Sequence, residues 1–144
     1  MTAVAIRTPA RFRLVAPVAP EDELHASVCD ALRYLCPADA VVNTWELRNA
    51  SSAVEGGRRK RLGALPGWPD MGVFWQSRIV LLELKRSRGG QLSPAQKALH
   101  PRLEAAGFPV RVVRSVNEAL DAVAAAGVPL RGKVLATLLS ETLA

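Results

Sequence analysis

Cysteine is scarce in this chain of 144 residues, which has only Cys29 and Cys36. Both fall in one predicted helix, and their seven-residue spacing separates them by about 10.5 Å along the helix axis. That distance is too long for a disulfide bond between them. Neither has the CxxC or Cys/His spacing of a zinc site. We therefore expect two reduced core residues in a cytoplasmic protein.

Long apolar runs and internal repeats are also missing. No stretch approaches the roughly 20 apolar residues that span a bilayer, so we expect no membrane partner. Residues 1–20 have no continuous apolar segment of the secretory kind and are interpreted as a basic, partly ordered arm. The hydrophobic fraction of 49% is nevertheless ample for the core of one domain.

Basic residues exceed acidic ones by 19 to 13, which gives a net charge of +6. A small basic domain favours a polyanionic partner, and nucleic acid is the first choice. Arg greatly outnumbers Lys, and Arg suits bidentate contacts with phosphate. Heavy use of Arg and Ala also follows from genomic base composition, so both explanations stay open.

The most informative stretch is residues 66–96, in which two apolar runs flank a polar break at Gln76-Ser77. This pattern predicts a β-hairpin. A loop centred on the break places Asp70 opposite Glu83. Directly opposite residues have Cβ atoms roughly 4.5–5.5 Å apart, so two carboxylates at these positions would repel each other.

Opposed carboxylates need a positive charge between them. Lys85 supplies one, and a divalent metal with oxygen ligands would satisfy the pair better. The alternative is a strand-end ion pair between Glu83 and Lys85, with Asp70 only stabilising the turn after Pro69. The spacing leaves both readings open.

A first helix is predicted to begin at Pro20 and to end before Pro37, because acidic residues fill its first turn and an apolar stripe follows. Glu21 shares the face of that stripe, whereas Glu23 points in a direction roughly 200° away from Glu21 around the helix axis. Plain complementarity with the helix dipole also explains Glu21. His25, one turn later, is by default a surface residue.

A later helix is predicted to begin at Ser93, with Ser at the N-cap, Pro94 at the first helical position and Gln96 at the third. This capping box explains Gln96 without any catalytic role. The helix is expected to run to about Ala106 and to stop at Gly107.

The remaining predicted elements are two strands and two helices, over residues 40–47, 110–114, 115–126 and 134–143. Ser115 and Glu118 are expected to form a second capping box. The last helix would pack on the core or on a second subunit.

Residues 49–67 are interpreted as a long, polar, Gly-rich loop. The loop carries four consecutive basic residues, Arg58, Arg59, Lys60 and Arg61. We interpret it as a substrate-gripping loop, because phosphate neutralisation supplies most non-specific affinity for nucleic acid. A merely solvated loop is the alternative. Arg86 and Arg88 extend the basic surface from Lys85.

Three motifs in order resemble the PD-(D/E)XK nuclease superfamily, and more narrowly its virus-type replication-repair nuclease domain, VRR-NUC. They are Pro69-Asp70, Glu83-Leu84-Lys85 and Ser93-Pro94-Ala95-Gln96. The resemblance covers most of residues 21–123. Each short motif is weak alone, but their order around a hairpin and before a helix makes the match specific.

The resemblance implies a metal site in which Asp70, Glu83 and the backbone carbonyl of Leu84 bind Mg²⁺, with Mn²⁺ as a substitute. An acidic residue near the start of the first helix joins such a site. By its facing, Glu21 is the matching position, and Glu23 is the fallback.

Two further roles follow from the resemblance. Lys85 would orient the attacking water or stabilise developing negative charge. Gln96 would help to hold water or Lys85. His25 stands where many members of the family have Gln, and this departure leaves its role open.

The element order implies an α/β fold with a mixed β-sheet. The resemblance implies the same arrangement, as a single restriction-endonuclease-like domain with helices flanking the sheet. We divide the chain into the basic arm (1–20), the nuclease-like domain (21–127) and a helical extension (128–144). The implied function is a metal-dependent DNA nuclease selective for branched, flap or junction DNA in replication, repair or recombination, often as a homodimer. The alternatives are a non-catalytic DNA-binding or assembly module and a restriction-type endonuclease, for which the chain has little room.

Overall fold

The computed structural model describes residues 20–45 and 52–131. The elements follow in the order α1 (Pro20–Leu35), β1 (Val41–Thr44), α2 (Ala53–Arg61), β2 (Met71–Trp75), β3 (Arg78–Leu84), α3 (Pro94–Ala105), β4 (Val110–Val113) and α4 (Val116–Ala125). The predicted N-terminal arm, except for Pro20, and the predicted helix over 134–143 lie outside the described residues.

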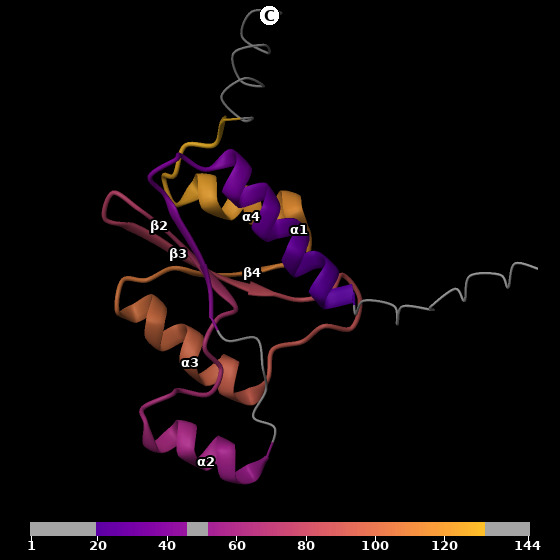
Figure 1. Ribbon diagram of the computed structural model, residues 1–144, viewed down its shortest axis with the longest axis vertical. Coiled ribbons are helices and arrows are strands. Elements are labelled where there is room, and N and C mark those ends of the chain that lie inside the picture. Colours follow the sequence, from indigo (N-terminus) through magenta and orange to yellow (C-terminus); the bar gives the residue numbers. More distant parts are fainter. Residues whose placement is uncertain (1–19, 46–51, 132–144) are drawn as a thin grey trace, which may run out of the picture.

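The strands form one mixed sheet in the order β1-β2-β3-β4. β1 with β2 and β2 with β3 are antiparallel, whereas β3 and β4 are parallel and are joined through α3. Figure 1 shows α1 and α4 together on one side of the sheet and α3 on the other. The predicted α/β architecture, a mixed sheet flanked by helices, is therefore confirmed.

The hairpin of β2 and β3 has the predicted register, with Trp75 opposite Arg78 and the pairing continuing to Met71 opposite Leu82. Its two-residue loop has positive φ values at Gln76 (44°) and Ser77 (64°). Tight hairpin turns of type I′ need positive φ at both positions, because that twist matches the flanking strands. The turn therefore fixes which residues face each other at the far end of the hairpin.

Alternation along β3 separates the two faces of the sheet. Val80, Leu82 and Leu84 are buried in the main core, which α1 and α4 cover from one side. Successive side chains of a strand point to opposite faces. Glu83 therefore lies on the other face, beneath α3, and it is buried there as well.

The prediction of a structureless loop over residues 49–67 is wrong in its middle part, where α2 spans Ala53–Arg61. The Ser52 hydroxyl caps this helix by accepting from the Glu55 N–H, and Arg59 pairs with Glu55 one turn away at 2.7 Å. The basic run occupies the last turn, where it complements the helix dipole. These local terms outweigh the two interior glycines that favoured a loop.

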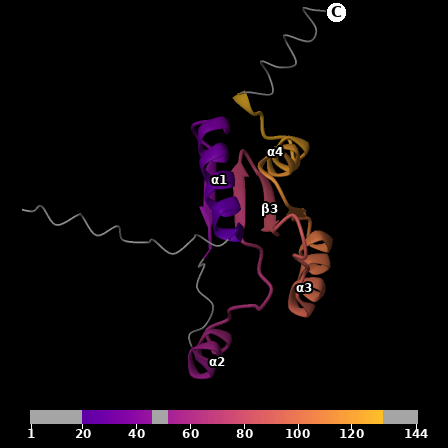
Figure 2. The same cartoon turned by 90° about the vertical axis from the view of Figure 1, so that its right-hand side faces the viewer.

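Figures 1 and 2 both show α2 at one end of the molecule, apart from the sheet. None of its nine residues is buried. The helix is therefore held by its cap and by side-chain pairs more than by packing.

Two further predictions need correction. The first strand extends only from Val41 to Thr44 and does not include Ala40 or Trp45, while residues 46 and 47 of the predicted strand lie outside the described residues. The second capping box is only half formed: Ser115 caps the Glu118 N–H, but the Glu118 carboxylate accepts from the Arg114 N–H, one residue earlier than expected.

The predicted helix stop at Gly107 is confirmed by its φ of +92°. In the parts of the chain placed by the structure, no helix combines the length and apolar character needed to cross a membrane.

Candidate active site

Asp70 lies at the open end of the hairpin, one residue before β2. Its carbonyl oxygen accepts from the Trp45 N–H at 3.2 Å, just beyond the end of β1. Its side chain reaches the end of β3, where Oδ2 accepts from the Leu84 N–H at 2.7 Å. Continuing the hairpin register by one step beyond Met71 and Leu82 places Asp70 opposite Glu83, as predicted.

Glu83 is the only acidic residue among the fully buried side chains of the described ranges, with 1% of its surface exposed. Its Oε1 accepts from Gln96 Nε2 at 2.5 Å and pairs with Lys85 Nζ at 2.9 Å. Its Oε2 has no hydrogen-bond partner. The His100 Nε2 atom lies 3.9 Å from Oε2, beyond hydrogen-bond distance.

Burial and, to a smaller extent, the nearby charge of Asp70 together raise the pKa of the Glu83 carboxyl from 4.5 to about 7. Hydrogen bonds and charge from Lys85 and Gln96 act in the opposite direction. Desolvation also lowers the pKa of His100, which favours a neutral imidazole. A buried carboxyl that titrates near neutral pH is a frequent property of functional sites.

Gln96 has both of the roles that the sequence left as alternatives. Its Oε1 accepts from the Ser93 N–H at 2.8 Å, and its own N–H donates to the Ser93 hydroxyl at 3.2 Å, which completes the capping box. The remaining Nε2 donates to Glu83. One side chain thus joins the start of α3 to the buried carboxylate.

His100 was missed by the sequence reasoning, although it lies one helical turn after Gln96 and therefore on the same face of α3. Its Nε2 bonds to the carbonyl of Gly67 at 3.2 Å, which fastens the turn before Asp70 to the helix. Gly67 has a φ of +83°, and a Cβ added there would lie 2.5–2.6 Å from the backbone of Ala95 and Gln96. Only glycine fits this close approach.

In the structure Glu21 does not lie beside Asp70 and Glu83. Glu21 and Glu23 are exposed in the first turn of α1, and α1 covers the face of the sheet opposite Glu83. Within residues 20–45 and 52–131, no three His, Cys, Asp or Glu side chains are grouped closely enough to hold a metal. The metal roles of Glu21, of Glu23 and of the Leu84 carbonyl stay predictions.

His25 has a specific partner, because its Nε2 lies 3.1 Å from the hydroxyl of Thr44 at the end of β1. Thr44 pairs with Met71, the residue after Asp70. The contact places the start of α1 at the same end of the sheet as the site, although on its other face.

The predicted nucleic-acid contacts fall into two groups. Arg86 and Arg88 are exposed in the loop directly after β3, and Arg114 donates to the Arg86 carbonyl at 2.8 Å. The four basic residues of α2 form the other group, at the projecting end of the molecule (Figure 1). In that second group Arg58, Lys60 and Arg61 are exposed, whereas Arg59 pairs with Glu55.

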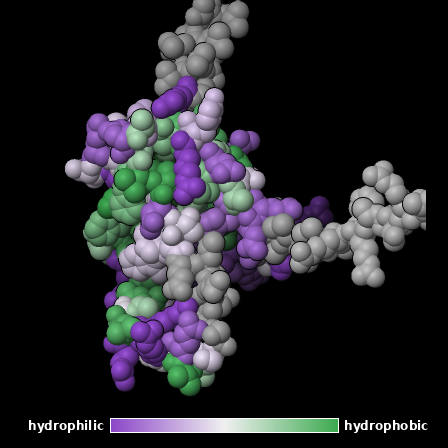
Figure 3. Space-filling view, viewed as in Figure 1, coloured by the Kyte–Doolittle hydropathy of each residue, from purple (hydrophilic) through white to green (hydrophobic). Residues whose placement is uncertain are grey.

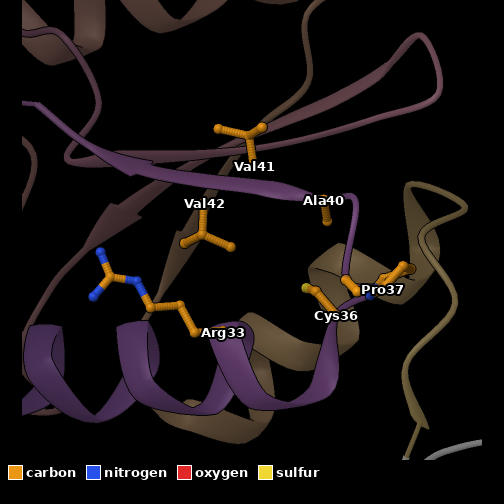
Figure 4. Close-up of a pocket in the computed structure, with 7 residues that line it drawn as sticks. Arg33, Cys36, Pro37, Ala40, Val41 and Val42 are labelled. Carbon is orange, nitrogen blue, oxygen red and sulfur yellow. The ribbon is translucent and has the colours of Figure 1, made fainter.

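A pocket of about 330 Å³ on the α1 side of the sheet contains no comparable chemistry. Figure 4 shows Cys36 and Val42 facing each other across it, with Arg33 at one side. Burial raises the pKa of the Cys36 thiol, so the reactive thiolate is disfavoured. Both cysteines are free.

Comparison with known proteins gives a likeness in structure. Neither a protein-family model nor a curated protein matches the sequence. A solved structure named "VRR_NUC domain protein" aligns with 73% of this chain and 85% of its own, at a TM-score of 0.54 and 19% identity. The chain has the VRR-NUC fold. Another solved structure, named "VRR_NUC domain", covers 72% of this chain and 94% of its own, with 20% identity and a TM-score of 0.49.

At this level of identity the likeness establishes the fold, so the chemistry must be argued from the side chains themselves. The VRR-NUC fold brings Asp70, Glu83, Lys85 and Gln96 together at the open end of the hairpin, over the face that α3 covers. That is the set that the three sequence motifs predicted, with His100 added.

Proposed function

We propose that this protein is a Mg²⁺-dependent nuclease that hydrolyses phosphodiester bonds in DNA. The observation that carries the proposal is the buried Oε2 of Glu83, which has no partner although it lies at the end of a hairpin opposite Asp70. An unpaired buried carboxylate oxygen costs free energy. A cation bound to this oxygen would offset that cost.

The residues fit such an ion. Carboxylate oxygens are hard ligands, and Mg²⁺ characteristically takes one or two of them together with waters and phosphate oxygens. Asp70 and Glu83 provide two carboxylates without a third acidic residue. Mn²⁺ accepts the same oxygen ligands and would serve as a substitute. A metal bound here would polarise the scissile phosphate and lower the pKa of a bound water.

Lys85 is well placed to assist. Its ammonium group lies 2.9 Å from Glu83 Oε1, and 15% of its side chain is exposed, so it reaches from the buried carboxylate toward solvent. In that position it would hold the attacking water or stabilise negative charge that develops on the phosphate. Gln96 fixes the orientation of Glu83 through the other hydrogen bond to the same oxygen.

The substrate class follows from charge and from the fold. The exposed basic residues of α2 and of the loop after β3 suit phosphate. Selectivity for branched, flap or junction DNA, and action as a homodimer, are proposals that rest on the resemblance to VRR-NUC domains.

The experiment compares single-stranded, duplex, flap and four-way DNA, each with EDTA, Mg²⁺ or Mn²⁺. We expect cleavage only with metal and faster cleavage of branched substrates. Asp70→Asn and Glu83→Gln should abolish cleavage and weaken Mg²⁺ binding in calorimetry, whereas Glu104→Gln, which changes a carboxylate elsewhere on α3, should change neither. Cleavage that survives excess EDTA would refute the proposal.

A non-catalytic DNA-binding module of the same fold is the second candidate. The absence of a third acidic side chain near Asp70 and Glu83, among the residues placed by the structure, favours it. Tight DNA binding without cleavage of any substrate, with either metal, would select this candidate.

A further inference from the structure

A pocket of about 460 Å³ lies between the C-terminal end of α2 and two tryptophan rings. Its lining includes Trp45 and Trp68 together with Arg59, Leu62 and Leu65. Its volume is in the range of small-molecule binding sites. No residue of the candidate active site lines it, so it is a separate feature.

The two rings are arranged as an aromatic platform. Their centroids are 5.8 Å apart and their planes meet at 72°, in an edge-to-face contact. Trp68 is 38% exposed, and Leu62 and Leu65 are also exposed. A large aromatic ring in an open pocket among exposed apolar side chains is suited to contact with a flat ligand.

Both tryptophans are attached to backbone that lies close to Asp70. Trp45 donates its N–H to the Asp70 carbonyl, and Trp68 precedes Asp70 by two residues. Trp45 lies directly over Gly72, where an added Cβ would meet its ring at 2.6 Å. These contacts hold the two tryptophans of the pocket close to the candidate cleavage site.

Exposed positive charge lies in the last turn of α2, next in sequence to the residues that line the pocket. Arg58, Lys60 and Arg61 belong to the last turn of α2, and Arg59 pairs with Glu55, the one acidic residue of that helix. Figure 3 shows hydrophilic and hydrophobic residues interleaved at this end of the molecule. Apolar rings next to several cations are the combination that binds single-stranded nucleic acid, in which bases stack and phosphates meet positive charge.

We propose that this pocket receives one unpaired nucleobase of the DNA, stacked on Trp68 beside the candidate cleavage site. The proposal rests on the proposed function for the position of the cut, but not for the binding of a base. A base that is paired in a duplex presents only its edges, so the pocket favours DNA with unpaired nucleotides near the cut. A smaller hollow that is also lined by the two tryptophans otherwise has only apolar side chains around it, and it offers no charged group to a base.

The test measures binding in EDTA, where cleavage does not interfere. The probes are a fluorescein-labelled oligothymidylate of about 12 nucleotides, a length within the site sizes of single-strand binders, and the same strand with abasic residues in place of thymidines. We expect the wild-type protein to bind the thymidine strand at least about fivefold more tightly, since stacking of one base contributes about 1 kcal/mol or more.

Trp68→Ala should reduce that preference and leave binding of the abasic strand unchanged, and Trp68→Phe should restore most of it. Trp75→Phe is the matched control, because Trp75 lies in the hairpin and bonds to Asp39; it should bind both strands as the wild type does. In that background, oligothymidylate should also quench the fluorescence of the two remaining tryptophans. Leu62→Ser, which shortens an exposed residue of the pocket wall without adding charge, should also reduce the preference for the thymidine strand.

Equal binding of the two strands by the wild-type protein, or an equal loss for both in Trp68→Ala and Leu62→Ser, would overturn the proposal. So would a result in which these variants dissociate a dimer in sedimentation but bind both strands normally, because the pocket would then be a protein interface. A protein that never cleaves yet prefers the thymidine strand would retain this inference and refute only the nuclease proposal.

Discussion

Gln96 holds Glu83 and the start of α3 with the same amide. Its Nε2 donates to Glu83 Oε1 at 2.5 Å while its Oε1 accepts from the Ser93 N–H at 2.8 Å. The helix cap and the candidate catalytic carboxylate are thus parts of one hydrogen-bonded unit. Substitutions that remove one half of this unit can separate the structural role from the catalytic one.

Gln96→Glu should separate them. A glutamate still accepts from the Ser93 N–H and suits a helix N-terminus, so we expect the free energy of unfolding to stay within about 1 kcal/mol, the scale of one cap. The donor to Glu83 is removed and a second carboxylate takes its place, so cleavage should slow at least about tenfold, or ~1.4 kcal/mol of barrier. A melting curve and single-turnover cleavage on the same preparation measure both.

Ser93→Ala is the matched control for that substitution. It removes the hydroxyl cap but leaves the hydrogen bond between Gln96 and Glu83 in place, so it should cost about 1 kcal/mol of stability while cleavage stays near the wild-type rate. Wild-type cleavage by Gln96→Glu would return Gln96 to the role of a cap alone.

The raised pKa of Glu83 predicts how stability depends on pH without metal. The pKa is about 7 in the folded chain against its usual 4.5, so between these values the folded state binds more protons than the unfolded state. The free energy of unfolding should therefore fall as the pH rises from about 4.5 to about 7, by at most about 3 kcal/mol, and this contribution should be level below 4.5. Urea unfolding in EDTA at pH 5, 6, 7 and 8 measures this.

Two variants calibrate the pH series. Glu83→Gln cannot titrate and should abolish the fall, whereas Asp70→Asn removes only the second cause of the raised pKa and should reduce it. A wild-type profile that is flat from pH 5 to 8 would contradict the assigned pKa.

The basic turn of α2 should contribute electrostatic affinity that does not depend on sequence. Changing Arg58, Lys60 and Arg61 to Ser should weaken binding to all duplexes alike and reduce the log–log salt slope by about 0.9 for each phosphate that the variant no longer neutralises. Arg33→Ser, in the last turn of α1, is the control and should leave the slope unchanged. An unchanged slope in the triple variant would mean that the turn is only solvated.

Gly67→Ala should destabilise the protein strongly. The residue has a φ of +83°, and a Cβ would lie 2.5–2.6 Å from the backbone of α3. Gly63→Ala is a close control, because its φ of +93° imposes similar strain in open space, for which about 1–2 kcal/mol is expected. Chemical denaturation should show a larger decrease in stability for Gly67→Ala, and equal decreases would show that α3 yields to the added methyl group.

The hairpin and α3 could be predicted because their signals are local. The break at Gln76-Ser77 fixed the register, and Ser93, Pro94 and Gln96 marked the helix start, as the structure confirms. In each case the deciding residues are neighbours in sequence.

The rest depended on information that a local pattern does not contain. Glu21 has the facing of a core residue, but which face of the sheet α1 covers depends on the path of the whole chain, and α1 covers the face opposite Glu83. α2 was missed because its glycines suggested a loop, whereas its stability comes from the Ser52 cap and the pair of Glu55 and Arg59. His100 carries no motif of its own, and only its spacing from Gln96 pointed to the site.

The bond from the Leu84 N–H to Asp70 Oδ2 has an evolutionary consequence. If the protein is the proposed nuclease, a descendant that had lost cleavage would still need Asp70 to join the end of β2 to β3, and Gln96 to cap α3, so selection would retain both. Glu83 is different, because its buried, unpartnered oxygen weakens the folded state. In such a lineage, replacement of Glu83 by an uncharged residue would be the first sign that activity had disappeared, while the Pro-Asp turn and the Ser-Pro-x-Gln start could persist unchanged.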